Sequence, residues 1–235
     1  MTDEREEGTG RLARAVLAAL CAALGAGLAA AVLSLPPRDP GLALEAAASL
    51  EASGVGNPVT AVLLSLRGYD TLLEVAVLLA ALAGVWSLVP DEAGRARPQP
   101  APAEPALAGF ARLAGPVGVL VAAYLFWTGA EAPGGAFQAA TVLAATVLLL
   151  RFAGLVGAPP AAGCGPGGTA VRLLSVAGFA TFLGVGLAGI ATTGTFLGYP
   201  PDAAKALILA IEATLTVSLA AILLLLVLGL PEDAP

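Results

Sequence analysis

The sequence has no histidine and little charge, and each shortage excludes a class of function. Because histidine is absent, the chain contains no imidazole proton relay and no histidine-ligated metal site. Only 12% of the 235 residues are charged, which is about half the share found in a typical soluble domain. No basic cluster of the kind that binds nucleic acid is present. The composition therefore argues against a soluble domain and against nucleic acid as a partner.

Cysteine is also scarce, since the chain contains only Cys21 and Cys164. Neither has the spacing of a metal site, so we expect a small hydrophobe inside an apolar run and a loop thiol, with no disulfide. The sequence contains no nucleophile–base pair, phosphate loop or set of redox ligands. Nothing in it indicates an enzyme acting alone or a bound cofactor.

Apolar residues are what the sequence has in abundance. They make up 58% of the chain, the mean hydropathy is +0.89, and they come in blocks of about 20, the length that crosses a bilayer as a helix. The short alternating segments of a membrane β-barrel are missing. The sequence therefore predicts an all-α, multi-pass membrane protein.

The apolar blocks predict six spans in a two-plus-four arrangement, at residues 12–35, 71–89, 107–130, 136–156, 170–193 and 204–230. The first block is too long for the apolar core of a signal peptide, so we expect an uncleaved helix. An eight-residue apolar piece, 59–66, is too short to span and would be an interfacial or a re-entrant helix. We expect a disordered tail at 1–11, a two-span module at 12–89, a proline-rich linker at 90–106, a four-span module at 107–230 and a tail at 231–235.

The basic residues predict an orientation. If both termini are cytoplasmic, eight arginines lie on the cytoplasmic side and three basic residues on the other, as the positive-inside rule favours. The cytoplasmic set would be Arg5, Arg11, Arg14, Arg95, Arg97, Arg112, Arg151 and Arg172, and the outer set Arg38, Arg67 and Lys205.

Acidic residues stand at two places where a membrane makes them costly, by roughly 2.5–3.5 kcal/mol at the centre of a span. At the first place, Arg67, Asp70 and Glu74 share one helical face. Asp70 would pair with Arg67 or cap the second span. Glu74 lies about one turn inside that span, so it would line a hydrated path or a seam between subunits, or else form a passive tertiary hydrogen bond.

The second place is Glu212, in the middle of the last apolar block. Lys205, Glu212 and Thr216 share a helical face there. A carboxylate beside hydroxyl groups suits a hydrated ion path. Hydroxyls in membrane helices also bond back to their own backbone or join helices, and this structural interpretation stays open for Thr216.

A third polar group follows the third span. Pro133, Gly134 and Gly135 predict a tight turn, and Gln138 begins the next span. The simplest interpretation is a helical hairpin in which Gln138 bonds to a neighbouring helix; the alternative places Gln138 on the ion path.

Two of these motifs resemble a known family. Residues 67–75, RGYDTLLEV, resemble a segment of Mrp-type cation/proton antiporter complexes, found near the end of the large A subunit or in the E-like subunit of membrane-bound hydrogenases. Residues 133–138, PGGAFQ, resemble the turn of the antiporter B subunit, the MnhB type. The chain departs from the family at Ala136 and Leu73, where glycine is usual, and at residues 212–215, EATL.

The resemblance implies an E-like module fused to an MnhB-like module in a complex related to respiratory complex I. It implies Na⁺ and H⁺ as transported ions, large A/D-type and small C/E/F/G-type subunits as partners, and a bacterial inner membrane as the location. The resemblance carries the acidic positions of the family over to Asp70 and Glu74, and its turn over to Gly134, Gly135 and Gln138. With the polar groups described above, we expect an ion path that contains Glu74, Glu212, Asp70, Arg67, Lys205, Thr216 and Gln138.

We therefore predict an accessory, ion-path-lining subunit of a multisubunit Na⁺/H⁺ antiporter without a cofactor of its own. Three alternatives stay open. The first is a structural connector whose carboxylates only pair with neighbours. The second is a subunit of a redox-driven hydrogenase or complex I-like pump. The third is a stand-alone transporter, for which inverted repeats are expected.

Overall fold

The computed structural model describes residues 3–35, 41–88, 104–157 and 165–228. Every regular element within these ranges is helical, which confirms the all-α prediction. The chain divides into two compact units, 1–42 and 43–235. Most of the predicted linker at 90–106, the predicted tail at 231–235 and the Cys164 loop lie outside the described residues.

The first unit contains one long helix, α1 (Asp3–Leu33). Its segment Arg14–Leu33 is long and apolar enough to cross a membrane, with a mean hydropathy of 2.4. Alanine and leucine dominate this segment, and both favour helix. Within its own unit nothing covers this segment, and an apolar surface of this extent requires a cover.

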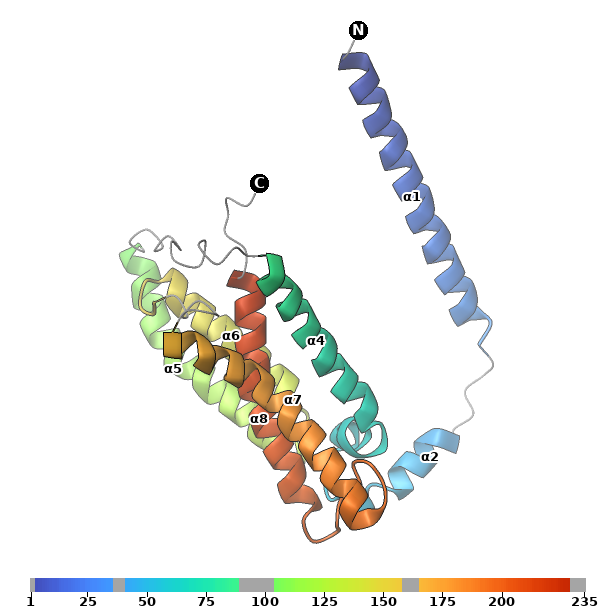
Figure 1. The fold of residues 1–235 in the computed structure, drawn as a ribbon, viewed down its shortest axis with the longest axis vertical. Coiled ribbons are helices and arrows are strands. Elements are labelled where there is room, and N and C mark those ends of the chain that lie inside the picture. The colour runs from blue at the N-terminus through green and yellow to red at the C-terminus, as the bar shows by residue number, and fades with distance from the viewer. Residues whose placement is uncertain (1–2, 36–40, 89–103, 158–164, 229–235) are drawn as a thin grey trace. The chain divides into compact units, whose positions relative to one another are not determined.

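The second unit is a bundle around α8 (Ala204–Leu228), which is drawn in red in Figure 1 and packs against α4, α5, α6 and α7. Ile208, Ile211, Leu215, Leu219 and Ile222 follow helical spacing along α8 and are at most 1% exposed. The other elements are α2 (Gly41–Ala48), η1 (Glu51–Ser53), α3 (Pro58–Ala61), η2 (Val62–Leu66), α4 (Gly68–Leu88), α5 (Pro105–Thr128), α6 (Ala136–Phe152) and α7 (Gly165–Thr193).

Five helices among the described residues are long and apolar enough to span a membrane, and α6 is a shorter apolar helix. Its 17 residues extend roughly 25 Å at 1.5 Å per residue. The sequence predicted that this span continues to residue 156. It ends at Phe152 because the backbone turns at Gly154, where φ is +67°, a conformation that does not continue a helix.

The short apolar piece before α4 is a broken helix. Asn57 caps its start by accepting a hydrogen bond from the Val59 N–H at 3.0 Å. After one turn of α-helix, residues 62–66 widen into a π-helical turn, in which the Arg67 N–H donates to the Val62 carbonyl at 2.7 Å. Single π turns often mark functional sites in membrane and soluble proteins. Here Leu63 and Leu64 of the π-helical turn line the same cavity as Glu212 of α8.

Candidate functional site

The buried core of α8 determines where Glu212 lies. Glu212 follows Ile211 on α8 and is only 3% exposed. Because α8 is surrounded by four other helices of its unit, the Glu212 side chain cannot reach the lipid-facing surface of the chain. A carboxylate at this place needs hydrogen-bond donors or water.

The α5–α6 turn supplies one donor. Gly134 packs so closely that a Cβ there would collide with the Leu125 carbonyl, and Gly135 adopts φ = +111°, which favours glycine. The Gly135 N–H donates to the Leu125 carbonyl at 2.8 Å. This tight turn exposes the first N–H groups of α6, and the Ala136 N–H donates to the Glu212 carboxylate. The positive end of the α6 dipole also stabilises a negative charge there.

The second carboxylate oxygen of Glu212, Oε2, is fully buried and has no hydrogen-bond partner among the described residues. The Glu212 side chain also lines a cavity of about 30 Å³, which is room for one or two water molecules. The opposite wall comes from the broken helix and the start of α4, through Thr60, Leu63, Leu64 and Thr71. Since buried polar atoms are normally satisfied, we expect water at Oε2.

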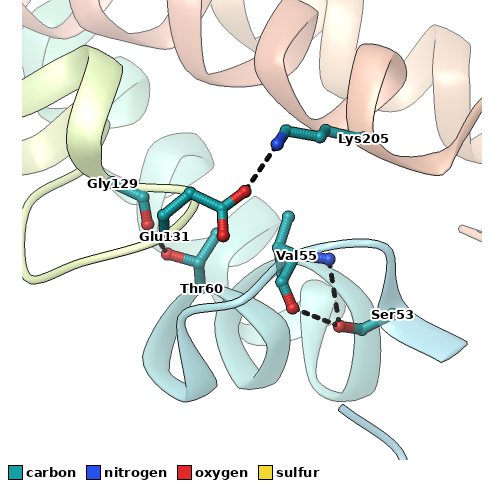
Figure 2. A network of polar contacts seen from close by, with 6 residues as sticks. All are labelled: Ser53, Val55, Thr60, Gly129, Glu131 and Lys205. Atoms are coloured by element: carbon teal, nitrogen blue, oxygen red, sulfur yellow. Dashed lines mark hydrogen bonds and ion pairs between the residues drawn. The ribbon is translucent and has the colours of Figure 1, made fainter. Parts of the chain in front are cut away.

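Polar contacts fix the broken helix against the α5–α6 turn. The Asn57 side-chain amide donates to the Gly129 carbonyl at 2.9 Å and to the Ala132 carbonyl at 2.8 Å. The Thr60 hydroxyl donates to the same Gly129 carbonyl at 2.5 Å, as Figure 2 shows. The two walls of the cavity are therefore joined by hydrogen bonds between segments about 70 residues apart.

Two further hydrogen bonds satisfy carbonyls that the break leaves free. The Thr71 hydroxyl donates to the Leu63 carbonyl at 2.7 Å. The Tyr199 hydroxyl, from the loop before α8, donates to the Leu64 carbonyl at 2.8 Å. Burial raises the pKa of the Tyr199 phenol, so Tyr199 acts here as a neutral donor. The break is thus a satisfied and stable feature of the fold.

Lys205 lies on α8 but does not pair with Glu212. Its ammonium group bonds to the Glu131 carboxylate at 2.5 Å, and both side chains are 56% exposed. Figure 2 shows this pair beside the Thr60–Gly129 hydrogen bond. Lys205 therefore ties the start of α8 to the α5–α6 turn at the surface.

The other residues that the sequence singled out on α6 and α8 differ in their surroundings. The Thr216 hydroxyl donates to the Glu212 backbone carbonyl at 2.7 Å, which agrees with the structural interpretation of this hydroxyl. Gln138 is exposed and lines the cavity. The Ser218 hydroxyl joins α8 to α7 by donating to the Ser175 carbonyl at 2.5 Å.

The other predicted carboxylate lies in a different environment. Glu74 is exposed on α4 and lines an open groove of about 690 Å³ together with Arg67, Asp70 and Val77. Arg67 and Asp70 form an ion pair across one helical turn. Asp70 thus pairs with Arg67, one of the two roles that the sequence left open.

Phe137 lies between the two carboxylates and was not singled out by the sequence. It lines both the Glu212 cavity and the Glu74 groove. Thr60 also escaped notice, because an isolated threonine at a helix start carries no distinctive pattern. Asn57 directly before Pro58 is a recognisable helix start, but its bonds to residues 129 and 132 are visible only in the fold.

The chain is similar to known membrane-complex subunits. Residues 106–230 match the model of a family described as a domain related to the MnhB subunit of the Na⁺/H⁺ antiporter. A search among curated proteins finds no match.

Two solved structures have a similar fold. A chain of the Mrp complex from Dietzia sp. DQ12-45-1b is 26% identical, with a TM-score of 0.62 over 93% of this chain and 26% of the matched chain. The present chain therefore spans about a quarter of that larger subunit. A chain of the membrane-bound sulfane sulfur reductase (MBS), an archaeal respiratory membrane complex, is 24% identical, with a TM-score of 0.68 over 90% of this chain and 97% of that one.

Proposed function

Because the chain belongs to the family of domains related to the MnhB subunit of Na⁺/H⁺ antiporters, we propose that it is an accessory subunit of a multisubunit cation/proton antiporter. In this proposal it lines part of the ion path in a bacterial inner membrane, with both termini in the cytoplasm. Its partners are large antiporter-like subunits and small accessory subunits of the same complex. The similarity to a subunit of an Mrp complex supports this assignment.

The buried Glu212 carboxylate is the observation that carries the proposal. The carboxylate accepts a hydrogen bond from the α6 N-terminus, its Oε2 has no partner among the described residues, and the side chain lines a water-sized cavity. Water in that cavity delivers a proton to the carboxylate or removes one. The α6 dipole stabilises the ionised form, whereas the apolar walls favour the neutral form. Both protonation states are therefore accessible, as a proton carrier requires.

Glu74 forms the second position on the proposed path. It stands on the surface of the chain, where a neighbouring subunit completes its environment. Arg67 and Asp70 set the electric field at this groove. Phe137 separates the groove from the Glu212 cavity, so a displacement of its ring would connect the two carboxylates through water. Gln138 and Thr216 border the Glu212 side of this path.

Substituting each carboxylate tests the proposal in everted membrane vesicles that contain the complete complex. Glu212→Gln keeps the shape and the hydrogen bond from Ala136 but cannot release a proton. We expect it to lower cation-driven proton movement at least about tenfold, which corresponds to ~1.4 kcal/mol, with the amount of assembled complex unchanged. Glu212→Asp should retain part of the activity, and Glu51→Gln, an exposed glutamate outside the spans, serves as the matched control.

Intact coupled transport in both Glu212→Gln and Glu74→Gln, at normal complex levels, would remove the ion-path role. If these substitutions instead reduce the amount of complex and leave the transport per complex unchanged, the chain is a structural connector.

The similarity to a respiratory-complex subunit favours a second candidate. In that case the chain would serve a redox-driven pump. Purification of the complex in mild detergent separates the two, because a redox-driven pump co-purifies with iron–sulfur subunits and an antiporter does not.

A further inference from the structure

The groove on α4 is an unusual surface for a membrane-spanning helix. It has a volume of about 690 Å³, and its lining combines the charged residues Arg67, Asp70 and Glu74 with apolar ones: Leu73, Val77, Leu78 and Phe137. Leu73 and Val77 are 61% and 67% exposed, so the apolar part of the groove is uncovered within this chain. An open apolar groove of this size on one helix face suits a second helix.

Glu74 makes lipid an unsuitable cover. It lies six residues after the start of α4, or about 9 Å along the helix axis, inside Gly68–Ser87, a segment long and apolar enough to cross a membrane. Its carboxylate forms no hydrogen bond or ion pair with any described residue. An ionised side chain on a lipid-facing surface at this depth is strongly disfavoured, so a polar group that the described residues do not supply must face Glu74.

Charge balance decides what that group is. Arg67 and Asp70 neutralise each other in their ion pair, which leaves Glu74 as the uncompensated charge of the groove. A partner with a positive side chain at this depth would neutralise it, and carboxylates in membranes are found paired in this way. From this we infer that the groove docks a membrane helix of another subunit that carries a lysine or arginine opposite Glu74.

The apolar segment of α1 that follows Arg14 contains no lysine or arginine between residues 15 and 33, so this segment cannot neutralise Glu74. The inference rests on the proposed function only in requiring a multisubunit complex. It makes no use of Glu212, so the transport assay of Glu212→Gln is independent of its outcome.

Photo-crosslinking in native membranes tests the docking surface. A benzophenone amino acid replaces Val77 in the groove and, as a control, Leu113 on the exposed face of α5. Mass spectrometry then identifies the attached segment. We expect Val77 to crosslink to a membrane helix of another subunit with a lysine or arginine within one helical turn of the attachment point. Crosslinks from Val77 to lipid, to α1, or to a helix without such a residue would overturn the inference.

Charge reversal provides the second measurement. Glu74→Lys should lower the partner retained on purification by about tenfold or more, as expected when one member of a buried charge pair is reversed. Changing the identified lysine or arginine of the partner to glutamate should restore retention. Glu51→Lys, in the exposed η1 turn, controls for added charge and should leave retention unchanged. Normal retention of the partner with Glu74→Lys would also refute the pairing.

Discussion

Glu212 and Glu74 are both carboxylates in membrane-spanning helices, and the chain treats them in opposite ways. Glu212 is 3% exposed, receives a hydrogen bond from the α6 N-terminus and faces a cavity of about 30 Å³. Glu74 is exposed beside an open groove of about 690 Å³. The chain thus builds the environment of Glu212 from its own helices, whereas we propose that a neighbouring subunit completes the environment of Glu74.

Phe137 borders both the cavity at Glu212 and the groove at Glu74. It belongs to the first turn of α6, and the N-terminus of this helix holds the Glu212 carboxylate. A change in the position of α6 would therefore act on both carboxylates together.

The largest effect is expected from Gly135→Ala. A Cβ at Gly135 would lie 3.1 Å from Glu212 Oε1, and the residue has φ = +111°, so alanine is strained whatever the space. We expect a loss of roughly 2–3 kcal/mol of stability, measured as a lower melting temperature of the purified complex. Gly154→Ala is the matched control, because Gly154 also has positive φ but nothing lies near its Cβ position; it should cost about 1 kcal/mol. Equal losses of stability in Gly135→Ala and Gly154→Ala would show that the close approach of Gly135 to Glu212 adds nothing to the cost of positive φ.

The wall is tested by Phe137→Ala. Removing the ring should join the cavity to the groove, so water-soluble reagents reach position 212 faster. The readout is maleimide labelling of Glu212→Cys in a background without Cys21 and Cys164. We expect the rate to rise by roughly tenfold, equivalent to ~1.4 kcal/mol. Phe110→Ala, on the exposed face of α5, should leave the rate unchanged, and an unchanged rate in Phe137→Ala would mean that the two spaces are separated by something else.

A smaller effect is expected from Tyr199→Phe, which removes the hydrogen bond to the Leu64 carbonyl. The loss should be about 1 kcal/mol. Burial raises the pKa of the Tyr199 phenol. The stability that its hydrogen bond contributes is therefore complete below the ordinary tyrosine pKa of about 10, and it is lost only as the pH rises above that value. The difference in melting temperature between Tyr199→Phe and the native complex should therefore be constant from acidic to mildly alkaline pH. A difference that vanishes near neutral pH would contradict this assignment.

The smallest effect is expected from Lys205→Met. The ion pair with Glu131 is more than half exposed, and such pairs contribute about 0–1 kcal/mol. Raising the salt concentration should reduce the difference from the native complex further. A loss above about 2 kcal/mol would show that Lys205 supports the Glu212 site more directly than its position suggests.

The sequence predicts the helices well because their apolar blocks are long and continuous. The Pro133–Gly135 turn is also visible, since proline and two glycines in succession favour a tight connection. Glu212 and Glu74 stand out because carboxylates are rare in apolar runs. What periodicity does not reveal is which of the two becomes buried, since that depends on packing between distant helices.

The contacts that complete the Glu212 site join residues far apart in the chain. Asn57 and Thr60 bond to residues 129 and 132 through their side chains, and no local pattern encodes such pairs. Helical spacing placed Lys205 and Glu212 on one face, yet Lys205 bonds to Glu131. Helical spacing shows on which side of α8 the Lys205 side chain leaves the helix. It does not show that the α5–α6 turn brings the Glu131 carboxylate to that side.

The central claim is that Glu212 exchanges a proton, and infrared difference spectroscopy of the assembled complex measures this directly. The carbonyl stretch of a protonated carboxyl group is followed while the pH is varied across the range in which the complex transports ions. The account predicts a band that changes with pH, persists in Glu74→Gln and disappears in Glu212→Gln. A spectrum in which Glu212→Gln removes no pH-dependent band would contradict the claim.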